Sequence, residues 1–452
     1  MSDERIVRPM RRMTRREALR LAAYAGAAGG ALGLIQACGG GGTSGGGGSS
    51  GGGTPANQKV QLVYAIPKDN TGVIPKLVDE WNSGNPKTQV QLQQTANNSA
   101  DMHNLLLTSF TSKSATPDVI NADVIWPGEF AAARWIRPLD DFLGSVRKQV
   151  FDSAIKVGEY KGKAYAVQLY YDSGQIYYRK DLLQKYGVGV PKTMDDLVSA
   201  SKKIQAGERA SNPNFWGFIW GGAKIENLVD EFLEWYWSLG GNLAGKNGGI
   251  QFDNDKGRKA LQFMVDTIHK DQISPPGTTT YKPADLVPFM QNGTGAFMRN
   301  WQFAWALVED QQQSKVAGKV GIVPIPGGGG ATGHGCTGGW CLTINANSKY
   351  PDRAWQFMQH MLGKQVQTTL ALDAADSPVR PDVLAEPQVK QNPFFAEIPQ
   401  ILKTAKSRPQ LRNYTQISAA LQTELSAAVV KQKSVADALK AGQQAVDQLQ
   451  SE

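Results

Sequence analysis

The stretch KVQLVYAIPKDNTGVIPKLVDEWNSGNPKTQVQL, residues 59–92, predicts a strand, a helix and a second strand in succession. Residues 59–64 alternate apolar and polar side chains, which is the pattern of a half-buried strand, and residues 88–92 repeat it. Between them, three apolar residues recur at helical spacing: Leu77, Val78 and Trp81. Gly84 and Pro86 then end the helix. This order is typical of sheets whose strands are joined by covering helices.

The chain continues in the same way. Residues 105–110 carry another helical stripe, and the apolar run at residues 118–120 predicts a third strand. A later helix opens on a capping box, Thr193 with Asp196. Further helical stripes and one strand follow within residues 228–239, 261–268, 319–323 and 354–361. Alternating strands and helices without a fixed internal repeat predict an α/β fold and disfavour solenoids and propellers.

The composition excludes several classes of protein. Charged residues make up 19% of the 452 residues, below the roughly 25% usual for soluble domains, which argues against extensive disorder. The formal charge of +8 falls to +4 without residues 1–37, which hold seven Arg and three acids, so nucleic acid is not an expected partner. The four His are scattered along the chain, so neither a metal nor another cofactor is expected.

The N-terminal segment predicts export and anchoring. Arg15 and Arg16 precede an uncharged Ala/Gly-rich stretch, residues 21–37, which resembles a twin-arginine secretory signal and is too weakly apolar for a permanent membrane span. Cys38 follows Leu-Ile-Gln-Ala as in a bacterial lipobox, which makes it the expected site of lipid attachment; an incidental cysteine is the alternative. Eleven of the fifteen residues 39–53 are Gly and the rest Ser or Thr, which predicts a flexible tether. We expect an exported lipoprotein whose body works outside the cytoplasm.

Enzymatic signatures are weak. Outside the glycine-rich linker the sequence has no Gly-x-Ser-x-Gly elbow, and it has no His-Glu-x-x-His and no phosphate-binding Gly-x-x-x-x-Gly-Lys-Ser/Thr loop. Carboxylate pairs for glycoside hydrolysis could be drawn from Asp123, Glu129, Asp172 or Glu231, but any chain with 40 acids offers such pairs. A secreted glycoside-active enzyme therefore stays as an alternative to a binding protein.

Aromatic residues are more informative. The chain has 11 Trp, 13 Tyr and 15 Phe, and several stand beside polar residues outside any helical stripe: Trp126, Tyr170, Trp301 and Trp340. Sugars need this mixture, because their C–H faces lie on flat rings while their hydroxyls hydrogen-bond to charged groups. Ligands of open α/β sheets bind beyond the carboxyl ends of strands, which favours a carbohydrate site there. The other interpretation is that these aromatic side chains only pack against the hydrophobic core at the ends of the elements.

Four blocks carry a family resemblance: residues 117–130, 177–183, 212–218 and 338–340. In this order they resemble the extracellular sugar-binding proteins of ABC importers, the family 1 solute-binding proteins, and most of all the trehalose/maltose-binding branch. The likeness covers residues 58–450. It implies the two-lobed periplasmic-binding-protein type II fold, each lobe a mixed sheet flanked by helices, with a hinge between the lobes. It also implies no catalysis, a monomer, and permease subunits as partners.

The family pattern supplies domain boundaries. It implies a signal over residues 1–37, then the lipidated cysteine and linker over residues 38–57. The N-terminal lobe would comprise residues 58–168 with 296–362. The C-terminal lobe would comprise residues 169–295 with 363–452.

The resemblance also implies roles for nine residues. Asp123 and Asp172 would accept hydrogen bonds from sugar hydroxyls, and Arg408 would donate from the second lobe. Stacking faces and a backbone contact would come from Tyr170, Trp301, Trp340 and Gly338. Two positions depart from the branch: Phe303 replaces a Tyr, and Asn70 stands near a family Glu. A family Arg is also missing at the nearest positions, Met102 or His103. The implied ligand is an α-glucosidic disaccharide of the trehalose or maltose type, with another oligosaccharide or a polyol as the alternative.

Cys336 and Cys341 bracket Trp340. An oxidising compartment favours a disulfide between them, which would stiffen the backbone that presents Trp340. Folding before export disfavours it, so a disulfide and two free thiols both stay open.

Overall fold

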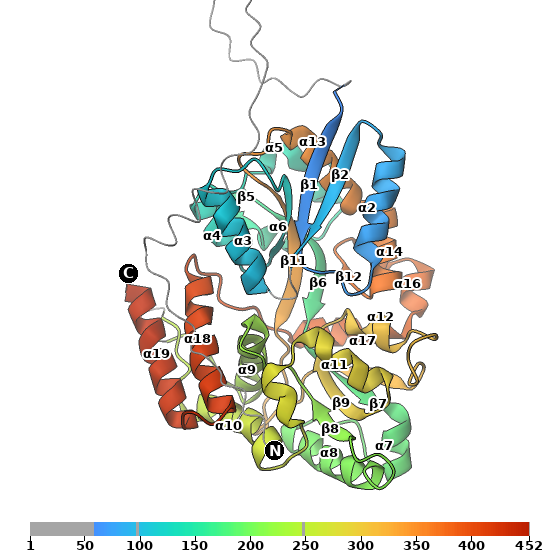
Figure 1. The fold of residues 1–452 in the computed structure, drawn as a ribbon, viewed down its shortest axis with the longest axis vertical. Helices are drawn as coiled ribbons and strands as arrows, with labels where there is room; N and C mark the ends of the chain where they lie inside the picture. Colours follow the sequence, from blue (N-terminus) through green and yellow to red (C-terminus); the bar gives the residue numbers. More distant parts are fainter. Residues whose placement is uncertain (1–57, 96–98, 246–248, 452) are drawn as a thin grey trace, which may run out of the picture. The chain divides into compact units, whose positions relative to one another are not determined.

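The computed structural model describes residues 58–95, 99–245 and 249–451. They form two lobes, each a mixed sheet flanked by helices, which is the predicted fold class (Figure 1). The first lobe contains the six-stranded sheet and the second lobe the four-stranded sheet. The predicted signal, Cys38 and the glycine-rich linker lie outside the described residues. Within the part of the chain that the structure describes, no helix is both long and apolar enough to span a bilayer.

The first sheet has six strands in the order β12-β6-β11-β3-β1-β2. In chain order these strands are β1 (Val60–Ile66), β2 (Thr88–Gln94), β3 (Val119–Asp123), β6 (Val167–Ser173), β11 (Thr337–Ile344) and β12 (Ser377–Pro378). β1 runs parallel to β2 and β3, whereas β11 is antiparallel to both β3 and β6. β11 is thus far from β3 and β6 in the sequence but lies between them in the sheet.

Helices cover both faces of this sheet (Figure 1). The helix predicted from residues 59–92 is α2 (Val73–Gly84), which buries Leu77, Val78 and Trp81 against the sheet. The indole N–H of Trp81 donates to the carbonyl of Thr88 at 2.9 Å and so ties the helix end to β2. The other elements of this lobe are α3 (Ser99–Thr111), α4 (Pro127–Ala132), α5 (Asp140–Leu143), η1 (Val146–Lys148), α6 (Asp152–Lys156), β4 (Glu159–Tyr160), β5 (Lys163–Ala164), α13 (Pro351–Met361) and α14 (Lys364–Ala374).

The second sheet has four strands in the order β10-β7-β9-β8. They are β7 (Gln175–Arg179), β8 (Trp216–Ile219), β9 (Gly295–Asn300) and β10 (Val320–Val323). Its helices are α7 (Lys180–Tyr186), α8 (Met194–Glu208), α9 (Glu226–Ser238), α10 (Asp255–His269), η3 (Pro276–Thr280), α11 (Pro283–Gln291), α12 (Ala304–Val308), α15 (Pro381–Leu384), α16 (Pro387–Gln391), α17 (Pro393–Thr404), α18 (Tyr414–Val429) and α19 (Val435–Ser451). The predicted capping box is present at the start of α8, where Thr193 and Asp196 bond each other's backbone N–H.

The strand pairing corrects the expected lobe boundaries. Residues 296–362 were expected in the first lobe, but β9 and β10 pair with β7 in the second sheet. Residues 363–452 were expected in the second lobe, but Val366 and Leu370 of α14 pack into the core of the first sheet. The chain passes between the lobes at Gly174, between β6 and β7, again between β10 and β11, and once more after β12. Sequence periodicity does not reveal these crossings, because a strand has the same pattern in either sheet.

Candidate functional site

All nine residues for which the resemblance implied ligand contacts line one pocket. Its lining includes Asn70, Asp123, Tyr170, Asp172, Trp301, Phe303, Gly338, Trp340 and Arg408. The space between protein atoms is about 1150 Å³, the open mouth included. Concave pockets lined by aromatic rings and a few polar groups are typical of small-molecule sites, so this pocket is the candidate ligand site.

The first sheet supplies a row of side chains across three strands. Trp340 on β11 lies opposite Asp123 at the end of β3 and opposite Tyr170 on β6. Two residues earlier on β11, Gly338 lies opposite Asp172. Residues opposite each other on neighbouring strands share a face of the sheet, so rings and carboxyls stand side by side there. Trp340 is braced from behind by Trp126, edge to face at 5.8 Å between ring centroids.

The second lobe supplies Trp301, which follows β9. Its indole N–H donates to Asn227 Oδ1 at 2.9 Å, and the Arg299 guanidinium carbon lies 4.3 Å from the ring centroid. A cation over an aromatic face stabilises the ring position. Trp301 is thereby held in one orientation at the pocket wall while staying partly exposed.

A buried ion pair supports this arrangement. Arg299 binds Glu234 of α9 through two hydrogen bonds, Nε to Oε2 at 2.8 Å and Nη2 to Oε1 at 2.5 Å. Both side chains are essentially inaccessible to solvent. Glu234 Oε1 also accepts the backbone N–H of Cys336 at 2.9 Å, so the same carboxylate connects α9 to the start of β11.

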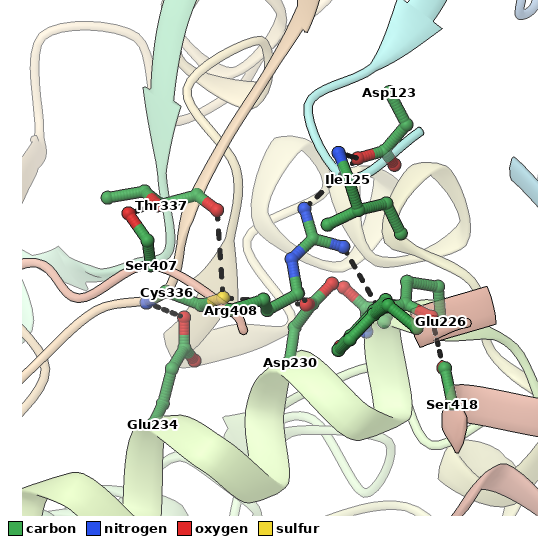
Figure 2. Close-up of polar contacts among 12 residues, drawn as sticks. Asp123, Ile125, Glu226, Asp230, Glu234, Cys336, Thr337, Ser407, Arg408 and Ser418 are labelled. Atoms are coloured by element: carbon green, nitrogen blue, oxygen red, sulfur yellow. Dashed lines mark hydrogen bonds and ion pairs between the residues drawn. The ribbon is translucent and has the colours of Figure 1, made fainter. Parts of the chain in front are cut away.

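Arg408 is the centre of a second charged cluster (Figure 2). Its Nη2 lies 3.2 Å from Asp123 Oδ1, and its Nη1 lies 3.0 Å from Glu226 Oε1. Its Nε is 3.3 Å from Asp230 Oδ1, an ion-pair distance without hydrogen-bond alignment. Arg408 therefore joins a first-lobe carboxyl, Asp123, to two second-lobe carboxyls on α9. Glu226 is fixed further by the hydroxyls of Tyr414 and Ser418.

Burial dominates the electrostatics of the pocket. It raises the pKa of Asp123, although Arg408 acts in the opposite direction. Burial raises the pKa of Asp172 to about 7, against the stabilising backbone N–H groups of Gln302 and Ser173. The pKa of Asp230 is raised well above its usual range, first by burial. The pocket thus holds carboxyls that take up protons more readily than exposed ones.

Sequence reasoning missed three acids of α9 and a carboxyl outside it. Glu226, Asp230 and Glu234 are spaced four residues apart, which places them on one helical face. The sequence carries a signal for them, because these acids recur at helical spacing beside the apolar stripe of α9. Asp376, just before β12, also lines the pocket and was not anticipated.

The structure also decides between the two alternatives for Cys336 and Cys341. Cys336 and Cys341 are both free and buried, so the disulfide alternative is wrong. Five residues of nearly extended chain separate their Cα atoms by roughly 16 Å, whereas a disulfide needs less than about 7 Å.

Met102 and His103, where a family Arg is missing, are buried in the first lobe, and His103 Nε2 lies 3.0 Å from Glu129 Oε2. Among the described residues no group of three or more His, Cys, Asp or Glu side chains is arranged to hold a metal ion.

The fold and the pocket together define a two-lobed solute-binding protein. Rings and carboxyls from both lobes line one pocket, and the chain crosses between the lobes beside it.

The chain belongs to the bacterial extracellular solute-binding protein family, whose sequence pattern matches residues 67–368. It is 32% identical over 372 residues to a probable ABC transporter-binding protein of Deinococcus radiodurans, covering 81% of this chain and 87% of that one. It is also similar to the maltose-bound MalE3 structure of T. maritima, with 33% identity, a TM-score of 0.82, and 86% and 99% of the two chains covered. A binding protein of Agrobacterium vitis, solved with D-mannitol, shares the fold at 23% identity and a TM-score of 0.76, with 86% and 98% covered.

These findings confirm the predicted membership in the family 1 solute-binding proteins of ABC sugar importers. Such proteins are binding components of transporters that work outside the cytoplasm, so the chain is not an enzyme. The glycoside-active alternative is thereby excluded.

Proposed function

We propose that this protein captures an α-glucosidic disaccharide of the trehalose or maltose type and delivers it to the permease of an ABC importer. The observation that carries the proposal is the convergence of two Trp rings, Trp301 and Trp340, with the carboxyls of Asp123 and Asp172 in one pocket. Flat rings take the apolar faces of a sugar, and carboxylate oxygens accept hydrogen bonds from its hydroxyls. The similarity to the maltose-bound MalE3 protein supports the same ligand class.

Asp123 and Asp172 each have one carboxyl oxygen that can accept a hydrogen bond from a sugar hydroxyl. Asp172 accepts backbone hydrogen bonds from Ser173 and Gln302 through Oδ1, at 2.7 and 3.0 Å. Asp123 likewise uses Oδ1 for Arg408 and for the Ile125 N–H. Within the described residues no hydrogen bond reaches Oδ2 of either carboxyl. Each therefore presents one oxygen for a sugar hydroxyl while the other holds the side chain in place.

Calorimetric titration with trehalose, maltose, sucrose and glucose tests the proposal. We expect binding of at least one disaccharide, and an affinity loss of about tenfold or more for Trp301→Ala, because stacking contributes about 1 kcal/mol beyond area burial. Trp216→Ala is a matched control, since Trp216 is also partly exposed and carries a cation, Arg209, 4.4 Å from its ring centroid. No heat of binding with any of the four sugars would refute the disaccharide assignment.

A polyol or a longer oligosaccharide is the second candidate. The shared fold with the mannitol-bound protein favours it, since the same scaffold accommodates an open-chain polyol there. Phe303 also favours it, because a phenyl ring at the pocket wall offers contact area but no hydroxyl to select among sugars. Competition of D-mannitol and maltotriose against the tightest disaccharide separates the two assignments.

We also propose a monomer that is exported by the twin-arginine route and anchored through a lipid on Cys38. The sequence supports this by Arg15 and Arg16 before the apolar stretch, and by the cysteine where it ends. Cys38→Ala should move the protein from the membrane fraction to the medium or periplasm. Replacing Arg15 and Arg16 by Lys should block export, whereas the same change at Arg11 and Arg12 should not. Retention of the Cys38→Ala protein in membranes would contradict the anchor.

A further inference from the structure

Asp376 is a pocket carboxyl without a partner. It lies just before β12, lines the pocket, and is 8% exposed. Among the described residues no hydrogen bond or ion pair reaches its side chain. A buried ionisable group without a partner is costly, so a ligand that completes its hydrogen bonds is the expected compensation.

The strand register places Asp376 beside Asp172. β12 and β6 are antiparallel, with Ser377 opposite Tyr171 and Pro378 opposite Tyr170. One more step in this register sets Asp376 opposite Asp172. Residues opposite each other on neighbouring strands have Cβ atoms about 4.5–5.5 Å apart on the same face. On its other side Asp172 faces Gly338, which has no side chain, so Asp376 is its lateral neighbour in the pocket wall.

The two carboxyls have different surroundings. Asp172 accepts two backbone N–H groups, which stabilise its ionised form. Asp376 has no such donors, and its pKa is raised well above the usual range by burial and by the nearby charges of Asp172 and Asp69. Adjacent carboxyls in a dry site do not ionise together, so the pair holds one proton, and Asp376 is the member that keeps it.

We propose that Asp376 contacts the sugar as a hydrogen-bond donor, and that Asp172 and Asp376 form a donor–acceptor pair that selects a sugar hydroxyl at this edge of the pocket. The inference rests on the proposed function and adds a specificity-determining residue to it. A hydroxyl both donates and accepts, so one acid beside one carboxylate matches it. A deoxy sugar that lacks this hydroxyl would leave both groups unpaired and would bind more weakly.

Other ionisable groups face this pair or share its pocket, so a pH profile must be compared between variants. Near the pair are Asp69 after β1, Tyr170 on β6, Arg299 on β9, Glu234 on α9 and Lys68 in the pocket lining. Farther along the pocket are Asp123, Glu226 and Asp230, which surround Arg408.

The test measures the affinity of the full chain for its tightest disaccharide between about pH 6 and about pH 10. The wild type should give a bell-shaped profile. Its acid limb reflects protonation of Asp172 near pH 7, and its alkaline limb reflects ionisation of Asp376. Asp376→Asn keeps an N–H donor but cannot ionise, so its alkaline limb should disappear while the acid limb stays. Asp376→Ala loses the donor, and its affinity should fall about 3- to 10-fold at the optimum.

Asp373→Asn is the matched control, because Asp373 lies three residues earlier on α14 and is exposed. It should retain the whole wild-type profile. An alkaline limb that persists in Asp376→Asn, or an unchanged affinity in Asp376→Ala, would overturn the inference and leave the proposed function standing. If the wild type binds no saccharide at any pH, the proposed function fails and the inference with it. Circular dichroism checks folding, and the near-isosteric Asn variant keeps the test available if the Ala variant unfolds.

Discussion

Gly338 of the first lobe packs against the indole ring of Trp301 of the second lobe. A Cβ on Gly338 would lie 2.8 Å from Cζ3 of that ring, closer than real Cβ contacts allow. The glycine is therefore required by the close approach of an aromatic ring, and the backbone of one lobe sets the position of a ring from the other. This contact links the arrangement of the lobes to the shape of the pocket.

Gly338→Ala should weaken sugar binding by about fivefold, because the added methyl displaces a stacking ring whose contact contributes about 1 kcal/mol. Isothermal titration calorimetry measures the effect. Gly189→Ala is the control, since a Cβ there would meet nothing within 4 Å. Equal affinities for the two variants would show that Trp301 does not contact the ligand.

Glu234→Ala should lower the free energy of unfolding by about 3–5 kcal/mol, because it leaves Arg299 buried without its countercharge. Chemical denaturation measures the loss. The double variant Glu234→Leu, Arg299→Met should recover most of it, since no uncompensated charge stays behind. A double variant as unstable as the single one would mean that packing, not charge, explains the loss.

Arg408→Met should also destabilise the protein by about 3–5 kcal/mol at neutral pH, because Asp123, Glu226 and Asp230 then face one another without a cation. The loss should shrink at about pH 4, because burial raises the pKa of Asp123 and of Asp230 and both then take up protons. Arg412→Met, four residues along the chain at an exposed position, serves as the control. A loss that does not depend on pH would contradict the electrostatic explanation.

Asp172→Asn should flatten the pH dependence of stability. The pKa of Asp172 is about 7 in the folded protein and about 3.9 in an unfolded chain, so the folded state binds the proton more tightly. Its contribution to stability is complete below about pH 4 and is lost as pH rises through 7, by up to about 4 kcal/mol.

Denaturation at several pH values should therefore show a shallower decline between about pH 4 and 7 in Asp172→Asn than in the wild type. Asp79→Asn, at an exposed position of α2, should leave the decline unchanged. An identical slope in the Asp172 variant would assign the decline to other buried carboxyls.

Several features were readable from the sequence because they depend on short-range patterns. The alternation of residues 59–64 and the helical spacing up to Trp81 predicted β1 and α2, since local periodicity fixes which face is buried. The types of residue suited to a sugar were also visible, because rings beside carboxyls at strand ends are unusual in a core. The resemblance of four blocks then predicted which nine residues line one pocket.

Tertiary structure alone decided the rest. Nothing in the local pattern of β9 and β10 says which sheet they join, because that depends on hydrogen bonds to β7, more than a hundred residues away from either strand. The position of Arg408 among three carboxyls, and of Asp376 beside Asp172, likewise comes from segments far apart in the chain. The sequence determined which groups exist and which faces are buried; their charges and protonation depend on neighbours that only chain folding brings together.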